Sequence, residues 1–209
     1  MDSSTTNIPL IMYQPQNILV LLTFYSPLII AVCVLSMSFI FQNFNGFIYL
    51  GFFIAVSILR EFILMISGVK SSTANATASI CSSVQYSKFG NSGFSVFAIA
   101  FTILYLCLPM FLNKDVNYVV FGILLAYLLL DIGIRSYKQC ISKIDIFINL
   151  VTGATAGVVI PMLMYAGGSS KYLFFNEVSS NKQICSMPKK QEFKCKVFQN
   201  GELIGSTNK

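Results

Sequence analysis

The fold is decided by one stretch, Gly90-Asn-Ser-Gly-Phe-Ser-Val-Phe-Ala-Ile-Ala-Phe-Thr-Ile-Leu-Tyr-Leu-Cys-Leu-Pro109. In it, a small polar turn leads directly into a long run of apolar residues without a charge. At about 1.5 Å per residue, a helix of this length crosses the roughly 30 Å hydrocarbon core of a bilayer. Asn91 or Ser92 can cap the helix, because a side-chain oxygen there accepts hydrogen bonds from free backbone amides. The stretch therefore predicts a capped transmembrane helix.

The composition also indicates a membrane protein. The chain has 209 residues, of which 55% are hydrophobic and 11% are charged, and its mean hydropathy is +0.71. It contains no histidine, so the commonest general base and metal ligand is missing. The six cysteines show no metal-binding spacing. We therefore expect no metal, no other cofactor and no nucleic-acid partner. Residues 1–16 contain no lysine or arginine, so we expect no cleavable signal peptide.

The apolar pattern predicts an all-α membrane protein, a bundle of about five transmembrane helices with a small hairpin-containing tail. A short arm covers residues 1–16, the bundle residues 17–168 and the basic tail residues 169–209. Pro27 is expected to kink the first span, since neighbouring helices can satisfy the freed carbonyl. The five predicted spans cover residues 17–41, 46–68, 93–112, 116–135 and 143–166.

Five spans would place the two termini on opposite sides of a membrane. The side with the N-terminus then carries five lysines and arginines and the other side eight, seven of them in the tail. The positive-inside rule favours a cytosolic C-terminus for this multi-pass protein. The loops at residues 69–92 and 135–143 would share the other face, where Cys81 and Cys140 could pair.

The tail contains a predicted β-hairpin. Residues 192–199 alternate polar and apolar, and Asn200-Gly201 provides a tight turn before residues 202–205. Because a two-stranded hairpin is marginally stable in water, we expect a protein partner to cover it, with adhesion to an acidic membrane surface as the alternative. The basic residues proposed for this contact are Lys189, Lys190, Lys194 and Lys196.

Charged residues inside the predicted spans are costly and need a reason. Arg60 and Glu61 lie near the end of the second span, where the simplest interpretation is interfacial snorkelling plus an ion pair with a neighbouring helix. Asp131 and Arg135 are four residues apart on one helical face and can pair with each other.

The last predicted span has one notable feature at its start and another near its middle. Ser142 and Asp145 have the spacing of a capping box, and a functional role for the carboxylate of Asp145 is the alternative. Gly153 and Gly157 form a GxxxG pattern, which allows close approach of a second backbone. We expect packing within the bundle, with dimerisation as the alternative.

Residues 91–94 at the start of one span, together with Arg135 and Asp145, resemble the motifs of the type 2 phosphatidic acid phosphatase family. Residues 91–94, Asn-Ser-Gly-Phe, stand where this family has PSGH at the start of a membrane helix. Its third motif, SRxxxxxHxxxD, matches the ten-residue step from Arg135 to Asp145. Glycines follow that aspartate at four and eight residues in the family, and here Asn149 and Gly153 stand there. The resemblance covers residues 60–157.

The departures from the family remove its chemistry. The histidine that takes the phosphoryl group in the family is replaced by Ile141, and the PSGH histidine that protonates the leaving group by Phe94. The first motif, KxxxxxxRP, would fall near Arg60, but Ser67-Gly68 replaces its Arg-Pro. The resemblance therefore implies a catalytically degenerate protein without catalytic residues. Residues left for contact with an anion or a lipid phosphate are Ser92, Gly93, Arg135 and Lys88.

Three functions follow from these observations. The favoured one is a non-catalytic membrane scaffold that presents its tail to a protein partner. The composition is similar to that of internal-membrane proteins of large DNA virus particles, so the tail could link such a membrane to a shell. The second is a non-catalytic membrane protein that binds a lipid phosphate, and the most remote is a lipid phosphate phosphatase.

Overall fold

The computed structural model describes residues 15–68, 81, 86, 89–114, 116–175, 194–199 and 202–208. It divides into two units, Met1–Glu177 and Val178–Lys209, which we describe separately. Among the predicted features, residues 1–14 of the arm lie outside the described residues, as do Lys88, Lys189 and Lys190.

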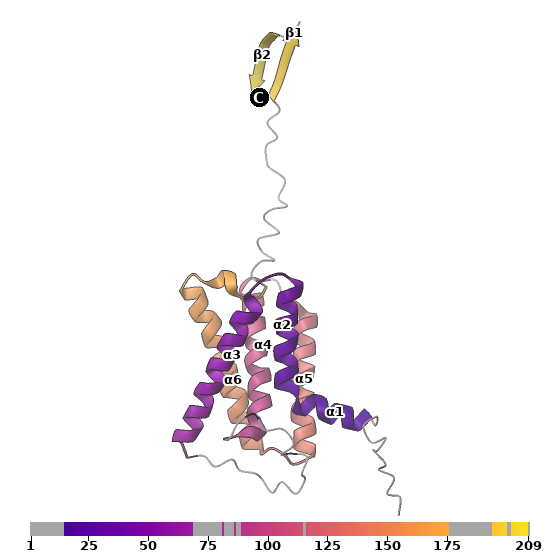
Figure 1. Ribbon diagram of the computed structural model, residues 1–209, viewed down its shortest axis with the longest axis vertical. Helices are drawn as coiled ribbons and strands as arrows, with labels where there is room; N and C mark the ends of the chain where they lie inside the picture. Colours follow the sequence, from indigo (N-terminus) through magenta and orange to yellow (C-terminus); the bar gives the residue numbers. More distant parts are fainter. Residues whose placement is uncertain are drawn as a thin grey trace, which may run out of the picture. The chain divides into compact units, whose positions relative to one another are not determined.

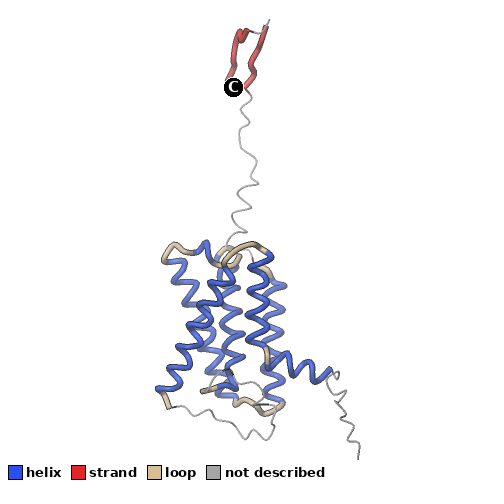
Figure 2. Tube along the Cα trace, viewed as in Figure 1, coloured by secondary structure: helices blue, strands red, loops and turns tan. Residues whose placement is uncertain are grey.

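The first unit is a helical bundle (Figures 1 and 2). Its polar turns and short 3-10 segments connect apolar helices. The elements are α1 (Pro15–Phe24), α2 (Ser26–Ile40), α3 (Asn45–Ile66), η3 (Asn91–Gly93), α4 (Phe94–Leu112), α5 (Tyr118–Tyr137), α6 (Lys143–Ala166) and η4 (Ser170–Tyr172). The all-helical membrane-type fold predicted from the sequence is therefore present in this unit.

Helix α4, which contains the stretch that opened the sequence analysis, is the centre of the bundle. Nearly all of its residues are buried by the surrounding helices. Aromatic side chains fill its contact with α3. Tyr49 of α3 is fully buried, and its hydroxyl lies 2.7 Å from the hydroxyl of Thr102 in α4. The ring of Tyr105 packs edge-on against Tyr49, 5.3 Å between centroids. Large side chains and one satisfied polar pair thus fill the space around α4.

Four helices are long and apolar enough to cross a membrane, namely α3, α4 with η3, α5 and α6, or five if α1 and α2 form one span. The first predicted span is not one gently kinked helix, because α1 and α2 meet at a bend of 76°, as in a broken span or a re-entrant loop. Pro27 is not a kink within a helix but the second residue of α2, where the missing amide costs no hydrogen bond. Figure 1 shows α1 turned away from the axis of the other helices.

The helix starts differ in part from the prediction. The N-cap position of α4 is Gly93, which has no side chain, and not Asn91 or Ser92. The Asn91 carboxamide instead accepts a hydrogen bond from the backbone amide of Tyr86, 2.8 Å away. A side-chain cap is present at α5, where Asn117 accepts hydrogen bonds from two amides of the first turn.

Helices α4 and α6 approach each other unusually closely. A Cβ atom on Gly153 would lie 2.4 Å from the carbonyl oxygen of Phe97, and one on Gly157 would lie 2.6 Å from that of Phe101. The GxxxG pattern therefore packs within the bundle, as predicted, because only glycine leaves room for the facing backbone.

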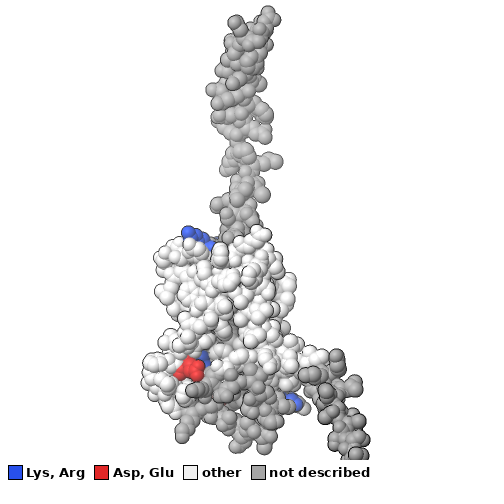
Figure 3. Space-filling view, viewed as in Figure 1, with Lys and Arg blue, Asp and Glu red and all other residues white. Residues whose placement is uncertain are grey.

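Charged groups are rare on the surface of this unit. The face in Figure 3 shows a broad uncharged surface across the described bundle, with a few charged atoms above and below its middle. Large apolar side chains of the bundle, such as Ile58, Ile123 and Leu163, are each more than 60% exposed. This surface is compatible with a multi-pass membrane protein.

The second unit contains two strands, β1 (Lys194–Gln199) and β2 (Glu202–Asn208). They pair antiparallel, with Gln199 opposite Glu202 and an irregularity between Val197 and Phe198. Lys194 and Lys196 lie opposite Asn208 and Ser206 in this register.

Candidate functional site

The most unusual side chain of the bundle is Arg60, which lies in α3 and is only 9% exposed. Its Nε and Nη2 donate hydrogen bonds to Asn149 Oδ1, at 3.2 and 2.6 Å, and Nη2 also donates to the carbonyl of Gly90 at 3.0 Å. The guanidinium lies over the rings of Phe94 and Phe97, 5.6 and 5.2 Å from their centroids. Its Nη1 atom is buried and makes no hydrogen bond within the described part of the chain.

This environment corrects the prediction for Arg60. The side chain does not snorkel to the bundle end, and its hydrogen bonds go to neutral oxygens instead of a carboxylate on a neighbouring helix. Glu61, the next residue of α3, attracts its charge through space. An arginine buried among neutral acceptors retains a strong preference for an anion.

Asn149 of α6 fixes the position of Arg60. Its Nδ2 donates to the backbone carbonyl of Asp145, 2.7 Å away, so its oxygen is free to accept from the arginine. Gly93 makes this possible, because a Cβ atom there would lie 2.1 Å from Asn149 Nδ2. The tight turn before α4, the start of α6 and the end of α3 therefore meet at one point.

The capping box predicted at the start of α6 does not form. Ser142 occupies the N-cap position, but its side chain makes no capping hydrogen bond. Asp145 lies in the first turn, where its charge suits the positive end of the helix. It also lines the cavity described next.

A cavity of about 410 Å³ adjoins Arg60 between α3, α6 and the turn before α4. Its exposed apolar side chains include Leu59, Ile63 and Ile148, each about half exposed. Irregular backbone at membrane depth is tolerated where it lines a cavity, and the turn does so here. The polar residues that line the cavity are Arg60, Gly90, Ser92, Asp145, Asn149, Thr152 and Thr155.

Arg135, the predicted anion contact, belongs to a second cluster. It forms a buried ion pair with Asp131, with Nε 3.2 Å from Oδ2, which confirms the predicted pairing. Its other donors reach the carbonyls of Ser92 and Thr23, at 3.2 and 3.3 Å. Arg135 does not line the cavity, and the guanidinium is already occupied by partners within the bundle. The anion contact predicted for Arg135 stays a prediction.

This ion pair stabilises the break between α1 and α2. Asp131 accepts hydrogen bonds from Ser26 at the start of α2, at 3.3 Å, and from Ser95, at 2.7 Å. The guanidinium of Arg135, in α5, reaches the C-terminal end of α1 and lies over the ring of Phe24, 4.7 Å from its centroid. The carboxylate thus meets the positive end of one helix and the guanidinium the negative end of the other.

Two tyrosines satisfy further carbonyls at the end of α1. Tyr127 donates to Leu22 at 2.8 Å, and Tyr86 donates to Phe24 at 3.0 Å. Desolvation raises the pKa of the Tyr86 hydroxyl above its ordinary value, so it remains a protonated donor. A broken helix in an apolar setting needs such donors for its last carbonyls.

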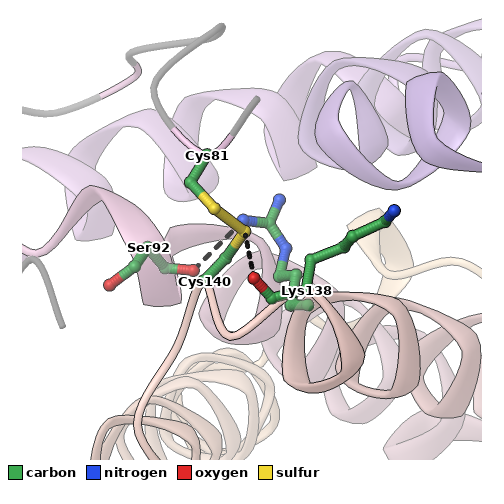
Figure 4. Close-up of a disulfide and its surroundings, with 5 residues drawn as sticks. Cys81, Ser92, Lys138 and Cys140 are labelled. Atoms are coloured by element: carbon green, nitrogen blue, oxygen red, sulfur yellow. Dashed lines mark hydrogen bonds between the residues drawn. A yellow bond between two sulfur atoms is a disulfide. The ribbon is translucent and has the colours of Figure 1, made fainter. Parts of the chain in front are cut away.

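A disulfide joins Cys81 and Cys140, so the pairing that the sequence left open is present (Figure 4). Figure 4 shows the bridge beside Ser92, the residue whose carbonyl accepts from Arg135. The bridge ties the segment before α4 to the turn between α5 and α6. It therefore holds the loops of both polar clusters at one end of the bundle.

Comparison of the chain with models of protein families, with curated proteins and with solved structures finds no match.

Several residues of the two clusters carry only a weak signal in the sequence. Asn149 stands where the phosphatase family has a glycine, and its carboxamide in an apolar span is the one signal of a buried partner. Ser26 and Ser95 hold the buried carboxylate of Asp131, but isolated serines in apolar helices are too common to indicate this. No spacing rule connects residues that are far apart in the chain.

Proposed function

We propose that this chain is a non-catalytic multi-pass membrane protein that binds the phosphate group of a membrane lipid at Arg60. The observation that supports it best is the buried guanidinium beside a cavity, with Nη1 unsatisfied among the described residues. An unsatisfied buried donor costs about 1–3 kcal/mol, and more when it is charged. A phosphate oxygen would remove this cost, because the planar guanidinium matches phosphate geometry.

A lipid fits this cavity better than a soluble anion does. Apolar side chains such as Leu59 and Ile63 are exposed beside the buried arginine, on a helix long enough to cross a membrane. A ligand that arrives from the bilayer can bring a phosphate together with apolar surface.

The proposal excludes catalysis because the chain has no histidine and its family-like positions hold Phe94 and Ile141. Both side chains are buried, and the ring of Phe94 packs against Arg60. Phosphoryl transfer of that family type needs a nucleophile and an acid that titrate near neutrality. Purified protein should release no more phosphate from phosphatidic acid than a mock preparation does.

The test is lipid retention after purification in a mild detergent, measured as protein-bound phospholipid by mass spectrometry. Arg60→Met should lose most of the bound phospholipid, and Arg60→Lys should retain part of it. Lys138→Met, which removes an exposed cation, is the matched control and should retain all of it. Size-exclusion profiles show whether each variant remains folded. Equal phospholipid in folded Arg60→Met and wild type would refute the proposal.

A scaffold role for the tail is the second candidate, supported by the hairpin that forms a unit of its own. A two-stranded sheet leaves both outer edges unpaired, and a partner strand could extend it. Deletion of residues 180–209 should leave membrane insertion intact and remove the main co-purifying protein. Retention of every partner by the truncated protein would contradict this role.

We also propose that the disulfide end of the bundle faces away from the cytosol and the tail faces the cytosol. Disulfides persist in oxidising compartments, and the lysine and arginine count favours a cytosolic tail.

A further inference from the structure

A second cavity continues the line of the first between the same two helices. It has a volume of about 390 Å³ and is lined mainly by apolar side chains, among them Ile48 and Phe52 of α3 and Ile160 and Met164 of α6. The Arg60 cavity is lined by Val56 of α3 and Ala156 of α6. Val56 lies four residues from Phe52, and Ala156 lies four residues from Ile160, so one helical turn separates the cavities on each helix. We call the two cavities together the α3–α6 groove.

The α3–α6 groove has one polar end and one apolar end. Arg60, Asp145 and Asn149 line the first end. The second end is lined by aliphatic and aromatic side chains, and its hydroxyl groups belong to Ser169 and Tyr172. From Arg60 to Ile48, helix α3 rises about 18 Å. One leaflet of a bilayer has a hydrocarbon depth of about 15 Å, half of the roughly 30 Å core. The groove is therefore long enough for one extended acyl chain.

We propose that the α3–α6 groove holds one acyl chain of a phospholipid, with its phosphate at Arg60 and its chain end near Ile48 and Met164. This inference rests on the proposed function and adds the path of the chain. The polar end of the groove matches the lipid phosphate, and the apolar end matches the acyl chain. Burial of the acyl chain against α3 and α6 adds apolar contact to the interaction of the phosphate with Arg60. The second chain of the lipid remains in the surrounding bilayer.

The test uses phosphatidic acid with a photoreactive diazirine at the end of one chain. The full-length protein is reconstituted with this probe and illuminated, and the labelled residues are mapped by mass spectrometry. We expect labels to concentrate on Ile48, Phe52, Ile160 and Met164. Equal labelling of outward-facing α5 residues such as Ile123 would overturn the inference, because the chain would then lie free in the bilayer.

Two variants separate this inference from the proposed function. Ala156→Phe fills the junction of the two cavities and should lower labelling at the apolar end by about tenfold, since several methylene contacts are lost. Ala126→Phe on the exposed face of α5 is the matched control and should change nothing. Unchanged labelling in Ala156→Phe overturns the chain path while the phosphate site stands. Unchanged labelling in folded Arg60→Met overturns the phosphate site itself.

Discussion

At the scale of single residues, the two buried arginines have opposite roles although both lie near the same turn before α4. Arg135 is neutralised by Asp131, and its donors are used by carbonyls of the bundle. Arg60 has neutral partners and a donor that remains unsatisfied within the described residues. The first is therefore expected to control stability and the second ligand binding.

Arg135→Met should lower the free energy of unfolding by about 3–5 kcal/mol, because it leaves the carboxylate of Asp131 buried without its cation. Thermal unfolding of the purified protein in detergent measures this loss. The double variant Asp131→Leu, Arg135→Met should lose less than the sum of the single variants, since no charge is then left unpaired. Lys138→Met is the control, and equal stability of Arg135→Met and Lys138→Met would refute the structural role.

At the scale of helices, the contact of α4 with α6 depends on glycines that leave room for a backbone. Gly153→Ala should lower the free energy of unfolding by about 1–3 kcal/mol, because its Cβ atom would overlap the carbonyl of Phe97. Gly133→Ala in α5 is the matched control, since a Cβ atom there meets nothing within 4 Å. It should be neutral or slightly stabilising. Thermal unfolding compares the two, and a Gly153→Ala variant as stable as the control would contradict the close contact.

The sequence predicted the helices better than the site. Apolar runs bounded by polar turns predicted α6 with its observed bounds and α3 to within two residues. The kink predicted at Pro27 is a full break at Tyr25, and the residues that contact the two helix ends there, Arg135 and Asp131, lie more than a hundred residues away in the sequence. The partnership of Arg60 with Asn149 was missed, since a local pattern contains no information on which helix becomes a neighbour.

At the scale of the molecule, the disulfide and the charge distribution make a joint prediction about sidedness. In sealed vesicles, a membrane-impermeant maleimide should label Cys140 of a Cys81→Ser variant from the side opposite to Cys185 of the tail. The wild type should show Cys140 labelling only after reduction, because the bridge blocks the thiol. Labelling of Cys140 and Cys185 from one side would contradict the proposed topology.

The position of α4 has a consequence for biosynthesis. This helix is at least as apolar as the helices around it, yet its surface is covered by them and not by lipid. Its closest neighbour, α6, begins at Lys143, thirty-one residues after α4 ends at Leu112. During translation, α4 must therefore leave the ribosome and enter the bilayer before its partner exists. Its apolar surface makes it stable in the bilayer as a single helix. Helix α6 then packs against it through Gly153 and Gly157 and replaces the lipid that covered this surface. Assembly of the bundle is thus expected to be a late event that follows insertion of its centre.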